Sequence, residues 1–285
     1  MSRLIYFFGL WFGHAVVWSI AISAFTISLV SSGMAGQHLT SLFADKLPTG
    51  TSPVEATWIK SSIFLPASAL KNKGSDHLSI FAQKDNWAET ARDKHLKNGI
   101  RLPAVIYLHG CSGFHRGRLF VKYFLNEGFA VFAPNSFGRP GRTEMCDQGD
   151  MDGRIATRRE EIKHAVSKVR EIEWIDSSRL VLAGFSEGGQ ATSDYGGKEF
   201  IAHVVLGTDC RYSGGSPNAP GNIPVLNLVG SDDEYDYGGG CSISDQRPKG
   251  SKRVIVKGGD HYMLNSEIPR LAIAKFLKTC CGQNQ

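Results

Sequence analysis

Three kinds of residue in this sequence could together carry out acyl transfer. Ser186 lies between glycines in "GFSEGG", the acidic pair Asp232 and Asp233 comes later, and His261 follows a glycine pair in "GGDH". A serine hydroxyl is a weak nucleophile at neutral pH, so it needs a base within hydrogen-bond reach and a group that orients that base. The set therefore indicates a nucleophile, an orienting acid and a general base, in that order along the chain.

The segments that flank Ser186 decide how the glycines around it are interpreted. G-x-S-x-G alone is a weak signal, because glycine and serine are common in turns and a serine can also cap a helix. Here the apolar segment 179–185 has the character of a buried strand, and residues 187–196 begin a helical segment. A serine on a sharp strand-to-helix turn leaves its hydroxyl exposed at the end of the sheet. The flanks therefore favour a nucleophile over a plain turn.

The elements that must position these residues are predicted by the order of apolar and amphipathic segments. Strand-like apolar segments occupy 102–110, 129–134, 179–185, 201–207, 223–230 and 253–258, and helical segments occupy 117–128, 154–174, 187–196 and 267–280. Upstream, residues 56–67 have strand character and residues 72–99 look loop-rich. This alternation predicts an α/β fold, a mostly parallel sheet with helices on both faces. Ligands of such sheets bind at the carboxyl ends of the strands, where all three kinds of residue fall.

Acyl transfer also needs donors for the oxyanion that develops on the carbonyl oxygen. Backbone N–H groups usually serve, one of them from the residue after the nucleophile, which is Glu187 here. The second is expected from the loop after strand 102–110, hence from Cys111 in "HGCSG". The alternative is a glycine-rich turn without a role in chemistry.

The residues themselves leave some assignments open. Asp232 and Asp233 both favour turns, and either could be the acid that orients the histidine. His261 could be a surface histidine, although it follows the last predicted strand, where a general base is expected. Phe137, Tyr235 and Tyr237 could line a substrate site or could serve packing alone.

Composition and charge exclude other classes of protein. The chain has 285 residues, of which 42% are hydrophobic, and a formal net charge of +5 with scattered basic residues. A nucleic-acid-binding protein would cluster those residues on one face, so no nucleic-acid partner is expected. The six cysteines lack the spacing of a zinc site, and we expect no metal or organic cofactor.

The N-terminus has the composition of a targeting segment. Residues 3–30 are almost wholly apolar, with Arg3 at the start and small residues at 31–36. We expect residues 1–35 to be a signal peptide, or a signal anchor that holds the protein in the membrane through residues 4–30 if it is not cleaved. A buried core helix is the alternative. Residues 36–285 would then form one catalytic domain outside the cytoplasm, periplasmic or secreted, where an even number of cysteines suggests disulfides.

The motifs "HGCSG", "PNSFGRPG", "GFSEGG", "GSDD" and "GGDH" resemble those of the α/β-hydrolase superfamily, and more loosely those of its dienelactone-hydrolase-like group. The resemblance covers roughly residues 103–278. It implies the α/β-hydrolase fold, and it points to Asp233, the third residue after the strand-ending Gly230, as the acid. Dienelactone hydrolases themselves carry a cysteine nucleophile, so Ser186 implies a serine esterase instead.

The same resemblance implies a pairing of the cysteines. Some relatives have cysteines at the positions of Cys111 and Cys146, and others at those of Cys210 and Cys241. The implied disulfides are Cys111–Cys146 and Cys210–Cys241, with Cys280 and Cys281 left over.

The resulting expectation is a serine hydrolase that cleaves small carboxylic esters or lactones through Ser186, Asp233 and His261. A serine peptidase of the same fold would use the same residues. A non-catalytic binding protein of this fold would normally have lost one of them. The expected partner is a small-molecule ester; oligomeric state is not predicted.

Overall fold

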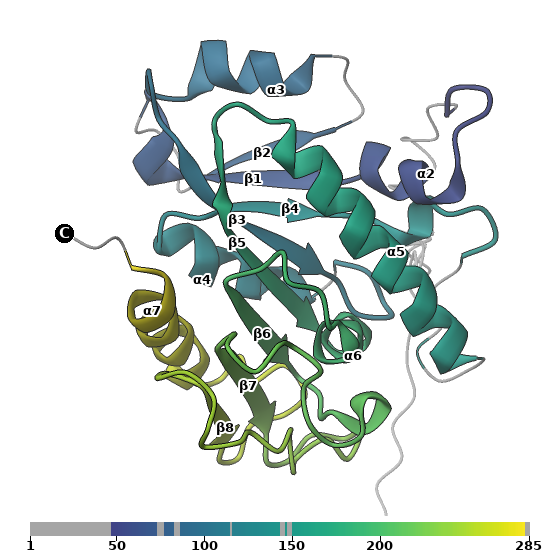
Figure 1. Cartoon of the computed structure of the whole chain (residues 1–285), viewed down its shortest axis with the longest axis vertical. Helices are drawn as coiled ribbons and strands as arrows, with labels where there is room; N and C mark the ends of the chain where they lie inside the picture. The colour runs from purple at the N-terminus through teal and green to yellow at the C-terminus, as the bar shows by residue number, and fades with distance from the viewer. Residues whose placement is uncertain are drawn as a thin grey trace, which may run out of the picture. The chain divides into compact units, whose positions relative to one another are not determined.

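The computed structural model describes residues 47–72, 77–82, 86–114, 116–142, 146 and 150–282. These residues contain one eight-stranded sheet with the strand order β2-β1-β4-β3-β5-β6-β7-β8 (Figure 1). The strands are β1 (Ser62–Pro66), β2 (His77–Phe81), β3 (Leu102–Leu108), β4 (Ala130–Ala133), β5 (Ile175–Phe185), β6 (Ala202–Leu206), β7 (Val225–Gly230) and β8 (Lys252–Val256). The expected signal or anchor segment 1–35, and the domain boundary after it, lie outside the described residues.

The sheet is parallel except at one edge. Strands β3 to β8 pair in parallel, whereas β1 is antiparallel to both of its neighbours, β2 and β4. The helices that connect and cover the strands are α2 (Pro53–Ile59), α3 (Trp87–Thr90), α4 (Leu119–Asn126), α5 (Met151–Arg170), α6 (Glu187–Asp194) and α7 (Ile268–Cys281). Short helical turns are η1 (Ala67–Ala69), η2 (Ala91–His95), η3 (Arg116–Arg118), η4 (Ser136–Gly138) and η5 (Arg211–Ser213).

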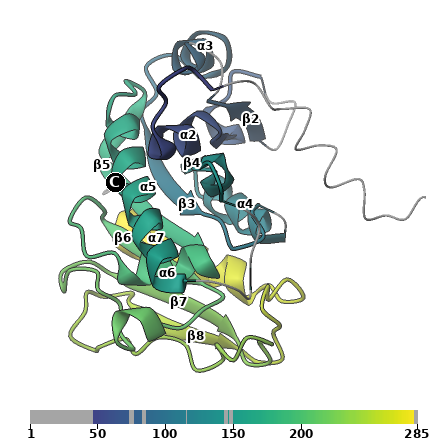
Figure 2. The ribbon, with the colours of Figure 1, turned by 90° about the vertical axis from the view of Figure 1, so that its right-hand side faces the viewer.

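Helices cover both faces of the sheet, as expected of buried parallel strands. On one face Ile162 and Val166 of α5 join a core with Ile106 and Leu108 of β3. On the other face α4 and α7 pack on a core that includes Tyr107, the β3 residue between those two. Alternate residues of one strand thus enter different cores, because successive side chains of a strand point to opposite faces. Figure 2 shows α4 and α5 on opposite sides of the sheet.

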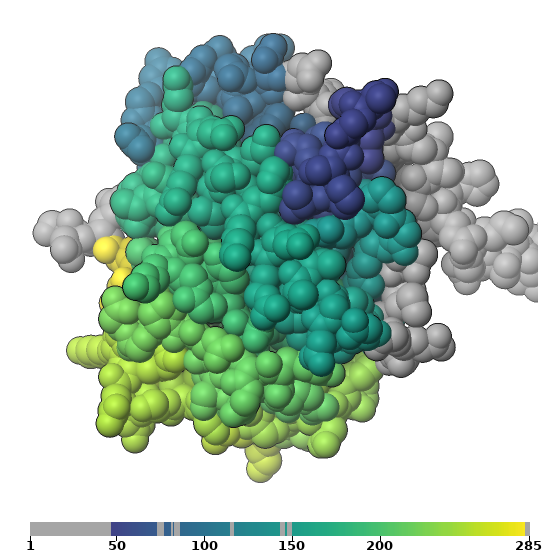
Figure 3. Space-filling view, turned by 45° about the vertical axis from the view of Figure 1, so that its right-hand side comes forward, coloured from purple at the N-terminus to yellow at the C-terminus, as the bar shows by residue number. Residues whose placement is uncertain are grey.

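The prediction for residues 56–67 was half right. Residues 62–66 form β1, but residues up to Ile59 belong to the helix α2. The apolar side chains of Trp58 and Ile59 also fit a strand pattern, which is why a strand was predicted there. The helix begins because Ser52 accepts a hydrogen bond from the Glu55 N–H and Pro53 occupies the first turn, both strong helix-start signals. Trp58 then stacks on Phe132 of β4, and α2 lies against the surface of α5 (Figure 3).

The prediction of loops for residues 72–99 was also incomplete. Strand β2 pairs with β1 at the sheet edge, and α3 and η2 follow it. The Nε1–H of Trp174 donates to the Ala88 carbonyl, and the rings of Trp87 and Trp174 meet edge to face. Long-range packing of a few aromatic side chains therefore orders a segment whose local sequence is mostly polar.

No helix in the described part of the chain is long and apolar enough to cross a membrane.

Candidate active site

Ser186 lies on the turn between β5 and α6, in a backbone conformation that favours glycine. Its φ is +54° and its ψ is −118°, so the residue occupies a strained region for an L-amino acid. A Cβ at Gly184 would overlap the Gly188 carbonyl, and one at Gly188 would overlap the Leu108 carbonyl at the end of β3. The two glycines are therefore needed for the turn to close, as in the strand–nucleophile–helix turn of hydrolases.

His261 and Asp233 form a buried hydrogen-bonded pair. The Nδ1 of His261 lies 2.8 Å from Oδ2 of Asp233, and the two residues are 3% and 8% exposed. The other oxygen of Asp233 accepts the Tyr235 N–H at 2.9 Å. Asp232 is exposed and accepts a hydrogen bond from the Ser231 hydroxyl at 2.6 Å instead. Of the two candidate acids, Asp233 is thus the one that contacts the histidine.

The histidine lies beside the turn that carries Ser186. The ring of His261 packs on Phe185 at a centroid distance of 4.8 Å, so it neighbours the residue before the serine. No hydrogen bond joins Ser186 Oγ to His261 among the interactions of the described residues. Catalytic hydrogen bonds often tighten only when substrate is bound, so a bond that forms with substrate is compatible with this arrangement.

The loop after β3 lies next to the same serine. A Cβ on Gly110 would lie 3.3 Å from Cβ of Ser186, and larger side chains at that position would crowd it. The backbone N–H of Cys111 and that of Glu187 donate no hydrogen bond to a backbone carbonyl within the described ranges. The Glu187 N–H is at the start of α6, where helix N–H groups have no partner inside the helix. Both groups are available to a developing oxyanion.

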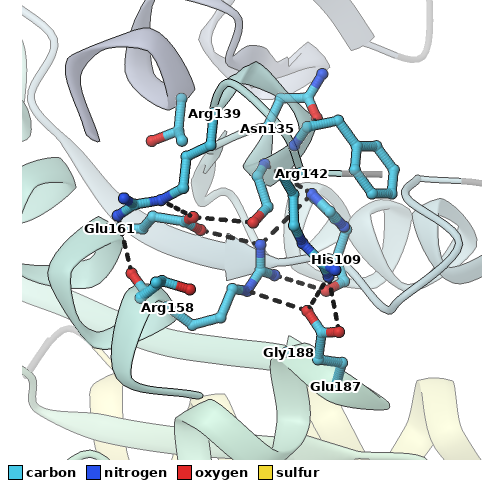
Figure 4. Close-up of polar contacts among 12 residues, drawn as sticks. His109, Asn135, Arg139, Arg142, Arg158, Glu161, Glu187 and Gly188 are labelled. Carbon is cyan, nitrogen blue, oxygen red and sulfur yellow. Dashed lines mark hydrogen bonds and ion pairs between the residues drawn. The ribbon is translucent and has the colours of Figure 1, made fainter. Parts of the chain in front are cut away.

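The side chain of Glu187 is buried among three arginines. It is 1% exposed, and its two oxygens accept from Arg142 Nη2 at 2.7 and 2.8 Å (Figure 4). Arg154 Nη1 lies 3.4 Å away and Arg158 Nε 3.9 Å away. The carboxylate next to the candidate nucleophile therefore ties the start of α6 to α5 and to the loop after η4.

Arg158 extends this network to the loop after β3. Its side chain is fully buried, and it donates to the His109 carbonyl at 2.6 Å and to Glu161 Oε2 at 3.0 Å. Glu161 also accepts from the Ser136 hydroxyl and from Arg139 Nε. We call Arg139, Arg142, Arg154, Arg158, Glu161 and Glu187 the arginine cluster.

His109 is held as a neutral imidazole at the end of β3. Its Nδ1 lies 2.7 Å from the Gly110 carbonyl and its Nε2 accepts the Ser136 N–H at 2.9 Å, which requires the proton on Nδ1. Burial and the charge of Arg158 lower the pKa of His109 well below its usual range. The residue thus links the "HGC" loop to η4 rather than exchanging protons.

Disulfides join the loops that surround the site. Cys111 is bonded to Cys146, and Cys210, which follows β6, is bonded to Cys241, which follows the segment carrying Asp233. These are the pairs that the resemblance implies. Cys280 and Cys281, left over in that scheme, are bonded to each other. Such bonds persist in oxidising compartments.

Two surface cavities lie elsewhere on the molecule. One, of about 450 Å³, is lined by Lys71, Arg92 and residues that precede β3 and β5; another, of about 420 Å³, is lined by Arg179, Lys278 and neighbours. Both adjoin the amino ends of the parallel strands, away from Ser186. Within the described ranges no three His, Cys, Asp or Glu side chains are grouped as metal ligands would be.

The sequence interpretation missed the arginine cluster. Arg158 falls on the same face of α5 as Ile155 and Ile162, so a charged residue interrupts an apolar helical stripe. A charge at a core position is rarely tolerated without a partner, and this interruption was the available signal.

Part of the chain matches a known protein family. Residues 91–218 match the model of the dienelactone hydrolase family, a region that includes Ser186 but ends before Asp233 and His261. No curated protein matches the chain.

Three solved structures with a similar fold are distant from this chain in sequence. The 2,6-dihydroxy-pseudo-oxynicotine hydrolase is 19% identical with a TM-score of 0.48, and the match covers 65% of this chain and 62% of that chain, less than two thirds of its length. Est1E from Butyrivibrio proteoclasticus, solved with ferulic acid, is 14% identical with a TM-score of 0.48, covering 65% of this chain and 92% of that chain. XC6422 from Xanthomonas campestris, described as a serine hydrolase without a lid, is 16% identical with a TM-score of 0.44. The match covers 64% of this chain and 84% of that chain. The family match and the sheet with its nucleophile turn together show the α/β-hydrolase fold, and residues 91–218 are similar to the dienelactone hydrolase family.

Proposed function

We propose that this protein is a hydrolase that cleaves carboxylic ester bonds of small esters or lactones, with Ser186, His261 and Asp233 as a catalytic triad. The observation that carries the proposal is the buried 2.8 Å contact between His261 and Asp233, beside a serine held at φ +54°. A histidine oriented by a carboxylate can take the proton of a neighbouring hydroxyl, and the strained turn places that hydroxyl at the end of the sheet.

The proposed reaction proceeds through an acyl-enzyme. Ser186 Oγ attacks the ester carbonyl while His261 Nε2 accepts its proton, and the N–H groups of Cys111 and Glu187 stabilise the oxyanion. His261 then protonates the leaving alcohol, and water activated by the same nitrogen releases the acid. Asp233 keeps the His261 proton on Nδ1 and stabilises the imidazolium. Every step uses residues of this chain, and none calls for a metal or organic cofactor.

We also propose that the protein works outside the cytoplasm, with residues 1–35 as a signal peptide or anchor. The disulfides of the loops around the site support this location, because a reducing cytoplasm would open them.

The test compares the full chain with two variants on p-nitrophenyl acetate and butyrate. Ser186→Ala should abolish turnover and labelling by a fluorophosphonate probe, whereas Ser167→Ala, an exposed serine on α5, should leave both unchanged. Equal turnover in the wild type and Ser186→Ala would contradict the proposal. Faster cleavage of matched anilides than of these esters would replace it with a peptidase.

A further inference from the structure

The ring of His261 is surrounded by four aromatic side chains, two of which come from the loop that carries Asp233. Tyr235 meets the imidazole edge to face at 4.7 Å, and Tyr237 lies 6.0 Å away. Phe185 and Tyr262 complete the set at 4.8 and 5.3 Å. Phe185 is almost fully buried and Tyr262 partly so, whereas Tyr235 remains 42% exposed. An exposed aromatic ring thus lies directly beside the proposed general base.

The side chains of Tyr235 and Tyr237 are held in place by contacts with each other and with Arg211. Their rings stack at 6.2 Å with an interplanar angle of 27°. The guanidinium of Arg211 lies 4.6 Å over the Tyr237 ring. Three hydrogen bonds to Asp209 and one to the Asp236 carbonyl hold it there. The Cys210–Cys241 disulfide joins the segment after β6, which carries Arg211, to the segment after β7, which carries both tyrosines. We call Tyr235 and Tyr237 the tyrosine pair.

The chemistry of the reaction places the leaving alcohol at this surface. His261 must deliver a proton to the leaving oxygen, so that oxygen lies within hydrogen-bond reach of its Nε2. The rest of the alcohol then extends over the groups around His261. Of the four residues, Tyr235 is the most exposed, and its ring is the one we expect to contact the alcohol. Aromatic rings stack favourably at separations of about 4.5–7 Å, so a flat ring would gain from this position.

The charges on the loop further narrow the class of alcohol. Asp232, Glu234 and Asp236 are exposed beside the tyrosine pair, and Asp209 offsets the nearby cation Arg211. A carboxylate on the leaving group would meet like charges there, which is unfavourable. An uncharged ring meets no such cost.

We propose that the tyrosine pair is a leaving-group subsite that selects esters of uncharged aromatic alcohols. The inference rests on the proposed esterase function of the same site. It assigns Tyr235 to specificity for the alcohol and leaves the acyl group to the opposite side of Ser186.

The test compares benzyl acetate with cyclohexylmethyl acetate, which differ mainly in whether the ring is flat and aromatic. In the wild type, kcat/KM should favour the benzyl ester by about three- to tenfold, the range expected of one aromatic contact. Tyr235→Leu should remove that preference and Tyr235→Phe should retain it. Tyr212→Leu, at a similarly exposed tyrosine on η5, is the matched control and should leave the preference intact.

Separate readouts distinguish this proposal from the esterase function and from misfolding. The ratio of p-nitrophenyl acetate to butyrate turnover reports the acyl side and should be the same in Tyr235→Leu and the wild type. Fluorophosphonate labelling of Ser186 shows that each variant has a competent site. An active wild type without the benzyl preference, or a labelled Tyr235→Leu that keeps it, would overturn the subsite. A wild type that turns over no ester and labels with no probe would overturn the esterase function itself.

If Tyr235→Leu does not fold, product inhibition of the wild type decides. Benzyl alcohol should inhibit p-nitrophenyl acetate hydrolysis more strongly than cyclohexylmethanol, and Tyr235→Phe should keep that order. Equal inhibition by the two alcohols would overturn the subsite.

Discussion

The carboxylate of Glu187 lies 2.7 Å from Arg142 and is almost completely buried, one residue after the candidate nucleophile. The residue has two separate uses. Its backbone N–H is one of the two proposed oxyanion donors, and its side chain anchors the start of α6 to Arg142, Arg154 and Arg158. The position of the N–H thus depends on a buried ion cluster (Figure 4).

Replacing Glu187 with Gln should lower both stability and activity. The side chain keeps nearly the same shape, but its charge is lost and the surrounding arginines are left with an excess of buried positive charge. We expect a loss of about 3 kcal/mol in the free energy of unfolding, measured with urea. A displaced oxyanion donor should also lower kcat for p-nitrophenyl acetate by about tenfold or more. Glu160→Gln, which removes an exposed partner of Arg139, should change stability by less than about 1 kcal/mol.

Asp233→Asn should reduce kcat far more than Asp232→Asn. An amide at position 233 favours the wrong tautomer of His261 and cannot stabilise the imidazolium, at a cost of about 10³–10⁴-fold in kcat. Asp232 faces solvent and contacts Ser231, so its amide variant should stay within about twofold of the wild type. Equal losses in the two variants would contradict the assignment of the acid.

Gly188→Ala should prevent the nucleophile turn from closing. The added Cβ would meet the Leu108 carbonyl, a backbone atom that cannot move aside. Overpacking of this kind costs about 1–3 kcal/mol or more, so thermal unfolding should begin at a clearly lower temperature and activity should be lost. Gly221→Ala is the control, because a Cβ there meets nothing within 4 Å. A Gly188→Ala protein as stable and active as Gly221→Ala would contradict this account of the turn.

Removing the Cys210–Cys241 disulfide should loosen the loop that carries Asp233. The bond closes a segment with a sequence separation of 31, so the double serine variant should lose about 2–4 kcal/mol of stability and part of its kcat. The corresponding Cys280/Cys281 double variant is the control, since a bond between adjacent residues closes no long loop. Similar stability losses in the two variants, by urea denaturation, would show that loop closure is not the cause.

The sequence was informative where chemistry and local pattern coincide. Ser186, the pair Asp232 and Asp233, and His261 could be singled out because each follows an apolar strand that the alternation of segments reveals, and all such ends meet at one edge of a parallel sheet. The choice of Asp233 within the pair came from the family resemblance. The order of the strands could not be predicted in the same way. That β1 lies between β2 and β4 is set by antiparallel pairings across large sequence separations, which no local pattern records.

The arginine cluster and α2 show two further limits. Arg158 interrupts the apolar stripe of α5, but the sequence does not reveal its partners Glu187 and His109, which only the fold brings against it. Helix α2 carried its start signal, Ser52 followed by Pro53, but its apolar residues matched a strand equally well. Pairwise contacts between distant segments decide both cases.

Stability should fall with acid before the carboxylates are protonated, because of buried histidines. Burial lowers the pKa of His203 to about 3, and burial also lowers that of His109, so the folded state resists protons that the unfolded chain accepts near its ordinary value of 6.5. The unfolded state then binds more protons, and the free energy of unfolding drops as pH falls from about 6.5 toward about 3. Each histidine contributes up to about 1.4 kcal/mol per pH unit.

Urea denaturation of the wild type and of His203→Phe between about pH 7 and about pH 5 tests this. The dependence of the free energy of unfolding on pH should be weaker in the variant, by up to one proton. The phenyl ring would pack near Tyr195 and Phe200, which neighbour the imidazole now. Equal slopes would mean that His203 does not resist protonation in the folded protein.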